Sequence, residues 1–251
     1  MSIASRASLS RRAVAELLGT ALLVATVIGS GIMGQALAGG NTAVALIANT
    51  LATGAGLVTL ILTFGPISGA HMNPVVTVAD AAQGGTPWRE VPIYVAAQIA
   101  GGLVGTACAH VMFGKPLFFA SQHARAGGPQ LFSEFIATFG LLSVIWGTSR
   151  SRPAATPFAV AAYITSAYWF TASTSFANPA VTIARAASDT FAGIRPADVP
   201  GFIGAQVVGS AAATFLFRWL VPKAPAVHPY LVSSAIASKE NHEDGTFRMR
   251  P

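Results

Sequence analysis

Two heptapeptides decide the fold of this chain: HMNPVVT at residues 71–77 and FANPAVT at residues 176–182. Each contains an Asn-Pro dipeptide and follows a long apolar stretch. Asn is a favoured helix N-cap and Pro is favoured at the first helical position, so each dipeptide predicts the start of a helix. The short Ala-rich runs that follow cannot cross a bilayer, which takes about 20 apolar residues. We therefore expect two half-helices.

Six apolar stretches of membrane-spanning length surround these dipeptides. Of the 251 residues, 53% are hydrophobic and 10% are charged, and the mean hydropathy is +0.58. A soluble domain carries about 25% charged residues, so the composition predicts an all-α integral membrane protein. The first stretch is too long for a cleavable signal peptide and lacks a cleavage site. The predicted spans are residues 14–37, 43–64, 91–113, 131–147, 154–175 and 199–221.

The net charge of +6 is best explained by topology. If the N-terminus is cytoplasmic, eleven Lys and Arg residues lie on that side, and only Lys115, Arg125, Arg185 and Arg195 lie on the other. The positive-inside rule then places both termini in the cytoplasm. Residues 223–251 are rich in Pro, Ser and charge and predict a disordered cytoplasmic tail.

Three segments of the first half of the chain recur in the same order in the second half. Such a repeat indicates one channel domain, residues 1–222, built from two copies at about 12–114 and 130–222. Each copy has three spans and one half-helix, so the copies insert with opposite topology, and a permeation site is expected near the bilayer midplane. The matching pairs are 15–20 with 133–138, 73–79 with 178–184, and 97–101 with 205–209.

Small residues recur at equivalent places in and just after the last of these pairs. Gly101 and Gly105 form a G-x-x-x-G motif, and Ala205 with Gly209 echoes it. Such spacing predicts close contact between helices in a membrane.

At these residues the chain resembles the aquaporin family, also called the major intrinsic proteins. The resemblance covers about residues 12–222 and also includes SGAH at 68–71. It implies a passive channel in the lipid bilayer and a homotetramer with one pore per subunit. The sequence has no catalytic triad, metal-ligand spacing or phosphate-binding loop, so we expect no enzyme, cofactor, metal site or nucleic-acid partner. The expected pore motif is Asn73, Pro74, Val75, Asn178, Pro179 and Ala180.

Two positions depart from the family pattern. Val75 stands where the family usually has Ala, and its two extra methyl groups either separate the half-helices or narrow one wall. Val181 stands where the family usually has an Arg of its selectivity filter. Together with Arg185, Val181 resembles a bacterial aquaglyceroporin subgroup associated with arsenic-resistance operons, which implies passage of neutral or methylated arsenicals and a place in the bacterial cytoplasmic (inner) membrane.

The resemblance also implies a selectivity filter. Because Val181 is apolar, we expect a wider and less polar constriction that favours neutral solutes larger than water. Asn73 and Asn178 should each offer an amide N–H to a passing solute. The predicted filter residues are Thr53, Thr165, Ser166, Ala167, Ser175, Phe176 and Val181.

Four ionisable residues leave alternatives open. Arg185 either returns positive charge to the pore mouth or forms a surface pair with Asp189, four residues away. Glu16 and Glu134 occupy matching repeat positions, and either brace the half-helix loops, as the resemblance implies, or form a proton relay. His71 is either a pH gate or a loop-packing residue.

The leading functional hypothesis is a channel for small uncharged solutes. We expect glycerol-like polyols, water and metalloid hydroxides such as arsenous acid to pass, together with methylated arsenicals. A water-selective aquaporin is the alternative within the same class. An inverted-repeat secondary transporter is the alternative from another class.

Overall fold

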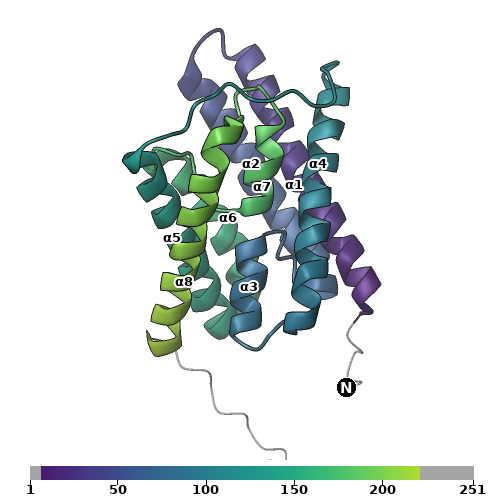
Figure 1. Ribbon diagram of the computed structural model, residues 1–251, viewed down its shortest axis with the longest axis vertical. Coiled ribbons are helices and arrows are strands. Elements are labelled where there is room, and N and C mark those ends of the chain that lie inside the picture. Colours follow the sequence, from purple (N-terminus) through teal and green to yellow (C-terminus); the bar gives the residue numbers. More distant parts are fainter. Residues whose placement is uncertain (1–6, 221–251) are drawn as a thin grey trace, which may run out of the picture.

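The computed structural model describes residues 7–220, which form a bundle of helices without a β-strand (Figure 1). The predicted tail at 223–251 and the last residue of the sixth span lie outside the described residues. In chain order the elements are α1 (Leu9–Leu37), α2 (Thr42–Ser68), α3 (Pro74–Ala82), η1 (Trp88–Glu90), α4 (Val91–Met112), α5 (Gly128–Ser151), η2 (Pro153–Ala155), α6 (Thr156–Phe170), α7 (Pro179–Ala186), η3 (Pro196–Asp198) and α8 (Val199–Leu220).

Five helices of the described chain are long and apolar enough to cross a membrane: α1, α2, α4, α5 and α8. The helix of the fifth predicted span, α6, is 15 residues long, which at 1.5 Å per residue is about 22 Å. The prediction of a span over 154–175 is wrong at its C-terminal end. Thr171 takes an extended conformation, and Thr174 and Ser175 have positive φ, so the chain leaves the helix after Phe170.

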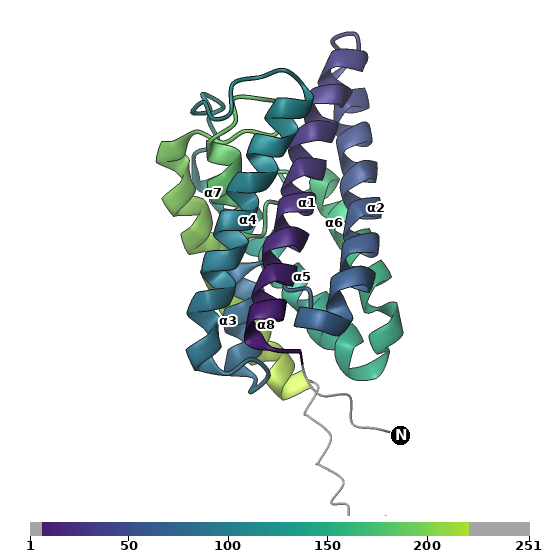
Figure 2. The ribbon, with the colours of Figure 1, turned by 90° about the vertical axis from the view of Figure 1, so that its right-hand side faces the viewer.

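The helices pack as two similar halves. In the first half, α1 packs against α4 and α2, and in the second half α5 packs against α8 and α6 in the same way. The half-helices α3 and α7 each contact both α4 and α8 and so join the halves. Both views place α3 and α7 in line along the long axis, with α7 farther from the start of α1 (Figures 1 and 2). We call the end of the bundle where α1 begins the terminal face, and the opposite end the distal face.

Glycine allows the close contact predicted at the repeated small residues. A Cβ at Gly101 would collide with the backbone oxygen of Leu17 in α1, and a Cβ at Gly209 would collide with the backbone oxygen of Phe135 in α5. The α1–α4 and α5–α8 pairs therefore pack backbone to backbone at equivalent places. This close packing brings the first and last helix of each half together around the half-helices.

Candidate functional site

The two Asn-Pro dipeptides begin the half-helices, as predicted. Asn73 is the N-cap of α3, and its Oδ1 accepts a hydrogen bond from Val75 N at 3.1 Å. Asn178 is the N-cap of α7, and its Oδ1 accepts from Ala180 N at 3.0 Å. Both Asn residues have extended backbones, which is usual for this cap. The N-termini of the two half-helices carry partial positive charge from their backbone dipoles.

The side chains of these caps also tie the two halves together. Asn73 Nδ2 donates to Ala177 O at 2.8 Å, and Asn178 Nδ2 donates to Met72 O at 2.7 Å. The two N-termini therefore meet inside the bundle. An amide group has two N–H donors, so one donor on each Asn remains for a solute.

The loops that precede the two caps have matching backbone conformations. Ala70 and Met72 have positive φ, and so do Ser175 and Ala177, each 105 residues later. Positive φ in non-glycine residues costs free energy, on the order of 1 kcal/mol each, and persists only where the surroundings impose it. In both loops the imposed conformation turns backbone N–H groups toward a buried carboxylate.

Those carboxylates belong to Glu16 and Glu134, which are both fully buried. Glu16 accepts backbone hydrogen bonds from His71 N at 2.9 Å and Met72 N at 2.6 Å. Glu134 accepts backbone hydrogen bonds from Phe176 N and Ala177 N, both at 2.9 Å.

Further polar side chains complete each carboxylate's hydrogen bonds. Gln98 Nε2 donates to Glu16 at 2.8 Å, and Gln206 Nε2 donates to Glu134 at 2.6 Å. Ser68 Oγ donates to Glu16 at 2.6 Å. Both carboxylates are therefore occupied by donors that hold the loops, and a proton relay through them has no support in these contacts.

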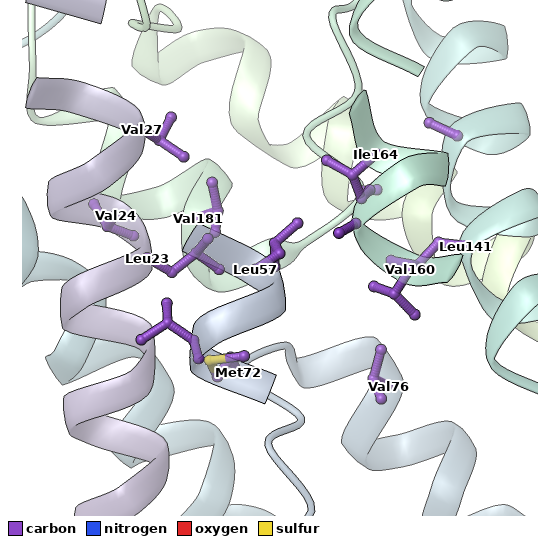
Figure 3. Close-up of a cluster of buried hydrophobic side chains, with 14 of the residues drawn as sticks. Leu23, Val24, Val27, Leu57, Met72, Val76, Leu141, Val160, Ile164 and Val181 are labelled. Carbon is purple, nitrogen blue, oxygen red and sulfur yellow. The ribbon is translucent and has the colours of Figure 1, made fainter. Parts of the chain in front are cut away.

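A cavity of about 280 Å³ passes the half-helix N-termini. It is lined by His71 and Asp80 near the terminal face and by Arg185 near the distal face. Figure 3 shows part of its wall, with Leu23 and Val27 on one side and Val160 and Ile164 on the other. Most of the wall is apolar, and the donors of Asn73 and Asn178 interrupt it midway.

Four of the predicted filter residues line this cavity: Thr53, Ser175, Phe176 and Val181. The hydroxyl of Ser175 is buried without a hydrogen-bond partner in the described part of the chain. Val75, by contrast, does not line the cavity. It is buried, and its carbonyl accepts from Ser210 of α8, so the alternative of a wall narrowed by Val75 is wrong.

The contribution of α6 differs from the prediction. Thr165, Ser166 and Ala167 do not line the cavity, whereas Tyr168 does. The Thr165 side chain packs against Gly54 of α2, and Ser166 is exposed with its hydroxyl bonded to Tyr163 O at 2.7 Å. Tyr168 OH lies 3.3 Å from Thr53 Oγ1.

A signal for Tyr168 was present in the sequence. Tyr168 follows Val160 and Ile164 at steps of four residues, so the three share one helix face. That face lines the cavity. The resemblance to the family instead implied residues 165–167, which end one residue before Tyr168.

Arg185 is buried at the distal end of the cavity, with 2% of its surface exposed. Its Nε donates to Ala192 O, and its guanidinium carbon lies 3.4 Å from the centre of the Phe176 ring. Asp189 instead accepts from Gln122 N at 2.9 Å. Among the described residues no ion pair joins Arg185 to Asp189, so the alternative of a surface pair is wrong.

His71 lies at the other end of the cavity. Its Nδ1 is 3.2 Å from Thr77 Oγ1, and its Nε2 is 3.8 Å from a carboxylate oxygen of Asp80. These contacts hold the imidazole against α3, and both His71 and Asp80 face the cavity.

The amino-acid sequence that forms this site is similar to the sequences of known proteins. Residues 3–168 match the family described as "Major intrinsic protein". The chain belongs to the major intrinsic protein family. Like the aquaglyceroporins of this family it is a multi-pass membrane channel and not an enzyme.

The chain is similar to an aquaglyceroporin and to an aquaporin of this family. Aquaglyceroporin AqpS of Rhizobium meliloti (strain 1021) is 52% identical over 216 residues, covering 86% of this chain and 92% of that protein. Aquaporin NIP1-3 of Oryza sativa subsp. japonica is 33% identical over 147 residues, covering 58% of this chain and 50% of that protein. The X-ray structure of the aquaglyceroporin from Plasmodium falciparum shares the fold, with a TM-score of 0.62 at 20% identity over 86% of this chain and 98% of that one.

Proposed function

We propose that this protein is a passive channel for glycerol-like polyols, water and metalloid hydroxides such as arsenous acid, including methylated arsenicals. The observation that carries the proposal is the cavity that passes both half-helix N-termini between mostly apolar walls. A solute that enters loses water and gains hydrogen bonds from Asn73 and Asn178. Because these donors are few, binding stays weak and passage stays fast.

The charges around the cavity support selection against cations. The two half-helix N-termini point at its middle with their positive dipole ends, and Arg185 adds a positive charge at the distal end. A neutral solute crosses this field without penalty. Arsenous acid is neutral at physiological pH and carries hydroxyl groups as a polyol does, so it fits the same requirements.

The constriction near Val181 supports solutes larger than water. In the proposed filter, Thr53 and Ser175 supply hydroxyl groups, while Phe176 and Val181 supply apolar surface. Tyr168 adds a hydroxyl already close to Thr53. A solute with both carbon and hydroxyl groups satisfies this mixed lining better than water does.

Three further assignments belong to the same proposal. Glu16 and Glu134 brace the loops that hold the two caps. The chain lies in a bacterial cytoplasmic (inner) membrane with both termini in the cytoplasm, supported by the excess of Lys and Arg that this orientation places inside. The protein is a homotetramer, supported by the resemblance to its family and tested by native mass spectrometry in detergent.

Stopped-flow light scattering on proteoliposomes tests the function. We expect the vesicle volume to change at least about tenfold faster than in protein-free liposomes when water, glycerol or arsenous acid crosses the membrane down its gradient. Fast water flux without glycerol flux would favour the water-selective alternative. Flux that saturates at low solute concentration and depends on a proton gradient would refute a passive channel.

A further inference from the structure

Phe176 contacts two buried guanidinium groups from different parts of the chain. The guanidinium carbon of Arg185, in α7, lies 3.4 Å from the centre of the Phe176 ring, and that of Arg125 lies 5.0 Å from it. The two carbons are therefore within about 8.4 Å of each other. Arg125 belongs to the loop between α4 and α5, which crosses the distal face (Figure 1).

Neutral acceptors hold Arg125 in place. Its Nε donates to Gly193 O at 2.8 Å, and its Nη1 donates to Ser173 O at 3.1 Å and Thr174 Oγ1 at 3.4 Å. Arg125 is 7% exposed. These contacts come from the loops on both sides of α7, so the guanidinium is fixed relative to the half-helix.

Among the described residues no side-chain carboxylate forms an ion pair with the guanidinium of Arg125, although Glu134 attracts it at longer range. The Asp198 carboxylate accepts a hydrogen bond from the backbone N of Arg125 at 2.8 Å and forms an ion pair with Arg195. Within residues 7–220, no ion pair involves the guanidinium of Arg125 or of Arg185. Burial lowers the pKa of Arg125 to about 10, so the group remains protonated at neutral pH.

Both arginines face the route into the pore. Arg125 and Arg185 line a hollow of about 450 Å³ on the distal face, together with His123 and Thr174. Arg185 also lines the pore cavity, so it stands where the hollow meets the pore. A solute arriving from the distal face therefore passes close to two fixed positive charges before it reaches Val181.

We propose that Arg125 is a specificity-determining residue of this pore, which with Arg185 supplies the fixed positive charge that Val181 does not carry. The inference rests on the proposed channel function and adds a residue to it. Because the charges sit beside the constriction and not in its wall, they exclude cations while leaving width for a carbon-bearing neutral solute. Charge selection and size selection are thereby assigned to different residues.

A pair of solutes with nearly the same shape separates charge from size. Urea is neutral, and guanidinium is a planar cation of similar size that stays charged at pH 7.5. The measurement is the ratio of urea flux to guanidinium flux into proteoliposomes containing the full chain. A fixed unit charge about 8 Å from the path of the solute, at an effective dielectric constant of about 20, changes the local concentration of a monovalent cation by more than tenfold.

Arg125→Gln and Arg125→Met remove the charge, and Met keeps an unbranched apolar stem against Phe176. We expect both to lower the urea-to-guanidinium ratio by at least about tenfold, through faster guanidinium entry, with urea flux within about twofold. Val181→Arg in the Arg125→Gln background should restore the ratio. Lys115→Gln removes an exposed charge from the same loop and should leave the ratio unchanged.

The outcomes separate the two proposals. If the unsubstituted protein passes neither urea nor glycerol above protein-free liposomes, the channel proposal fails. If it passes both, and either folded neutral variant at position 125 keeps the original ratio, the role of Arg125 is overturned. If the ratio falls but Val181→Arg does not restore it, the loss reflects displaced loops and not missing charge, which also overturns the inference. Size-exclusion elution identifies the folded variants.

Discussion

Asn73 and Asn178 each cap one half-helix and bond the loop that carries the other. Asn73 Nδ2 lies 2.8 Å from Ala177 O, one residue before Asn178, and Asn178 Nδ2 lies 2.7 Å from Met72 O, one residue before Asn73. The two hydrogen bonds that join the halves of the bundle therefore use the same side chains that line the cavity. Stability and permeation are coupled at these two positions.

Asn73→Ala is expected to impair both properties. The variant loses the cap and leaves Ala177 O without its donor, so we expect the free energy of unfolding to fall by about 2 kcal/mol. Glycerol flux should fall by at least about tenfold, because a midway donor is gone. Asn41→Ala is the matched control, since Asn41 caps α2 at an exposed position. Equal glycerol flux in the two variants would contradict the role of Asn73.

Glu134→Gln tests the bracing role of the buried carboxylates. Glu134 accepts from three N–H groups, and the NH₂ group of Gln would face one or more of these donors. We expect a loss of about 3 kcal/mol in the free energy of unfolding, visible as a lower melting temperature in detergent. Glu16→Gln should behave alike. Folded variants with normal stability, and solute flux that follows a proton gradient only in the unsubstituted protein, would instead favour the proton relay.

Val181→Arg should narrow the pore and make it more polar. We expect glycerol flux to fall about tenfold relative to water flux, because the long cation occupies space that Val181 leaves open at the filter. Val181→Leu adds bulk without charge and separates the two effects. A glycerol-to-water ratio that is the same in all three proteins would show that position 181 does not face the solute.

Gly209→Ala and Gly204→Ala compare two glycines of one helix. A Cβ at position 209 collides with the backbone of α5, whereas a Cβ at position 204 meets nothing within 4 Å. We expect Gly209→Ala to cost about 2 kcal/mol because α5 and α8 must separate. Gly204→Ala should be neutral or stabilise by up to about 1 kcal/mol, since Ala is the better helix former. Melting temperatures of the purified variants give the comparison, and equal values would disprove the close contact.

The lowered pKa of His123 predicts that cation exclusion at the distal face depends on pH. Burial, Arg125 and Arg185 lower the pKa of His123 below its ordinary value of 6.5, and Asp189 opposes them. The imidazole is therefore neutral at pH 7. Its contribution to stability is complete above pH 6.5 and is lost as the pH falls through its lowered pKa.

Protonation of His123 would add a third positive charge to the hollow. We expect the urea-to-guanidinium ratio to rise below pH 6.5 in the unsubstituted protein and to stay flat in His123→Gln. Flux measured between pH 5 and 7.5 checks this expectation. A rise that persists in His123→Gln would assign the titration to another group.

Much of the architecture follows from local sequence patterns. The apolar stretches, the Asn-Pro caps and the repeated segments each act over a few residues to a few turns, so the spans, the half-helices and the inverted repeat are readable directly. The placement of Glu16 and Glu134 at matching positions follows in the same way. Span 154–175 is the exception, because the loop after Phe170 is held by hydrogen bonds that the backbone N–H groups of Phe176 and Ala177 donate to the Glu134 carboxylate, some 40 residues earlier.

Other features were decided only by tertiary structure. A helix turns by about 100° per residue, so the shift from residues 165–167 to Tyr168 depends on how α6 is rotated against α2. The path of the loop after α4 depends on contacts with Gly193, Ser173 and Asp198, some 50 to 70 residues later. The sequence alone determined that this chain is an inverted-repeat channel with Val at position 181. Only long-range packing decided that Arg125 and Arg185 meet at Phe176, because no local pattern records where a loop crosses a bundle.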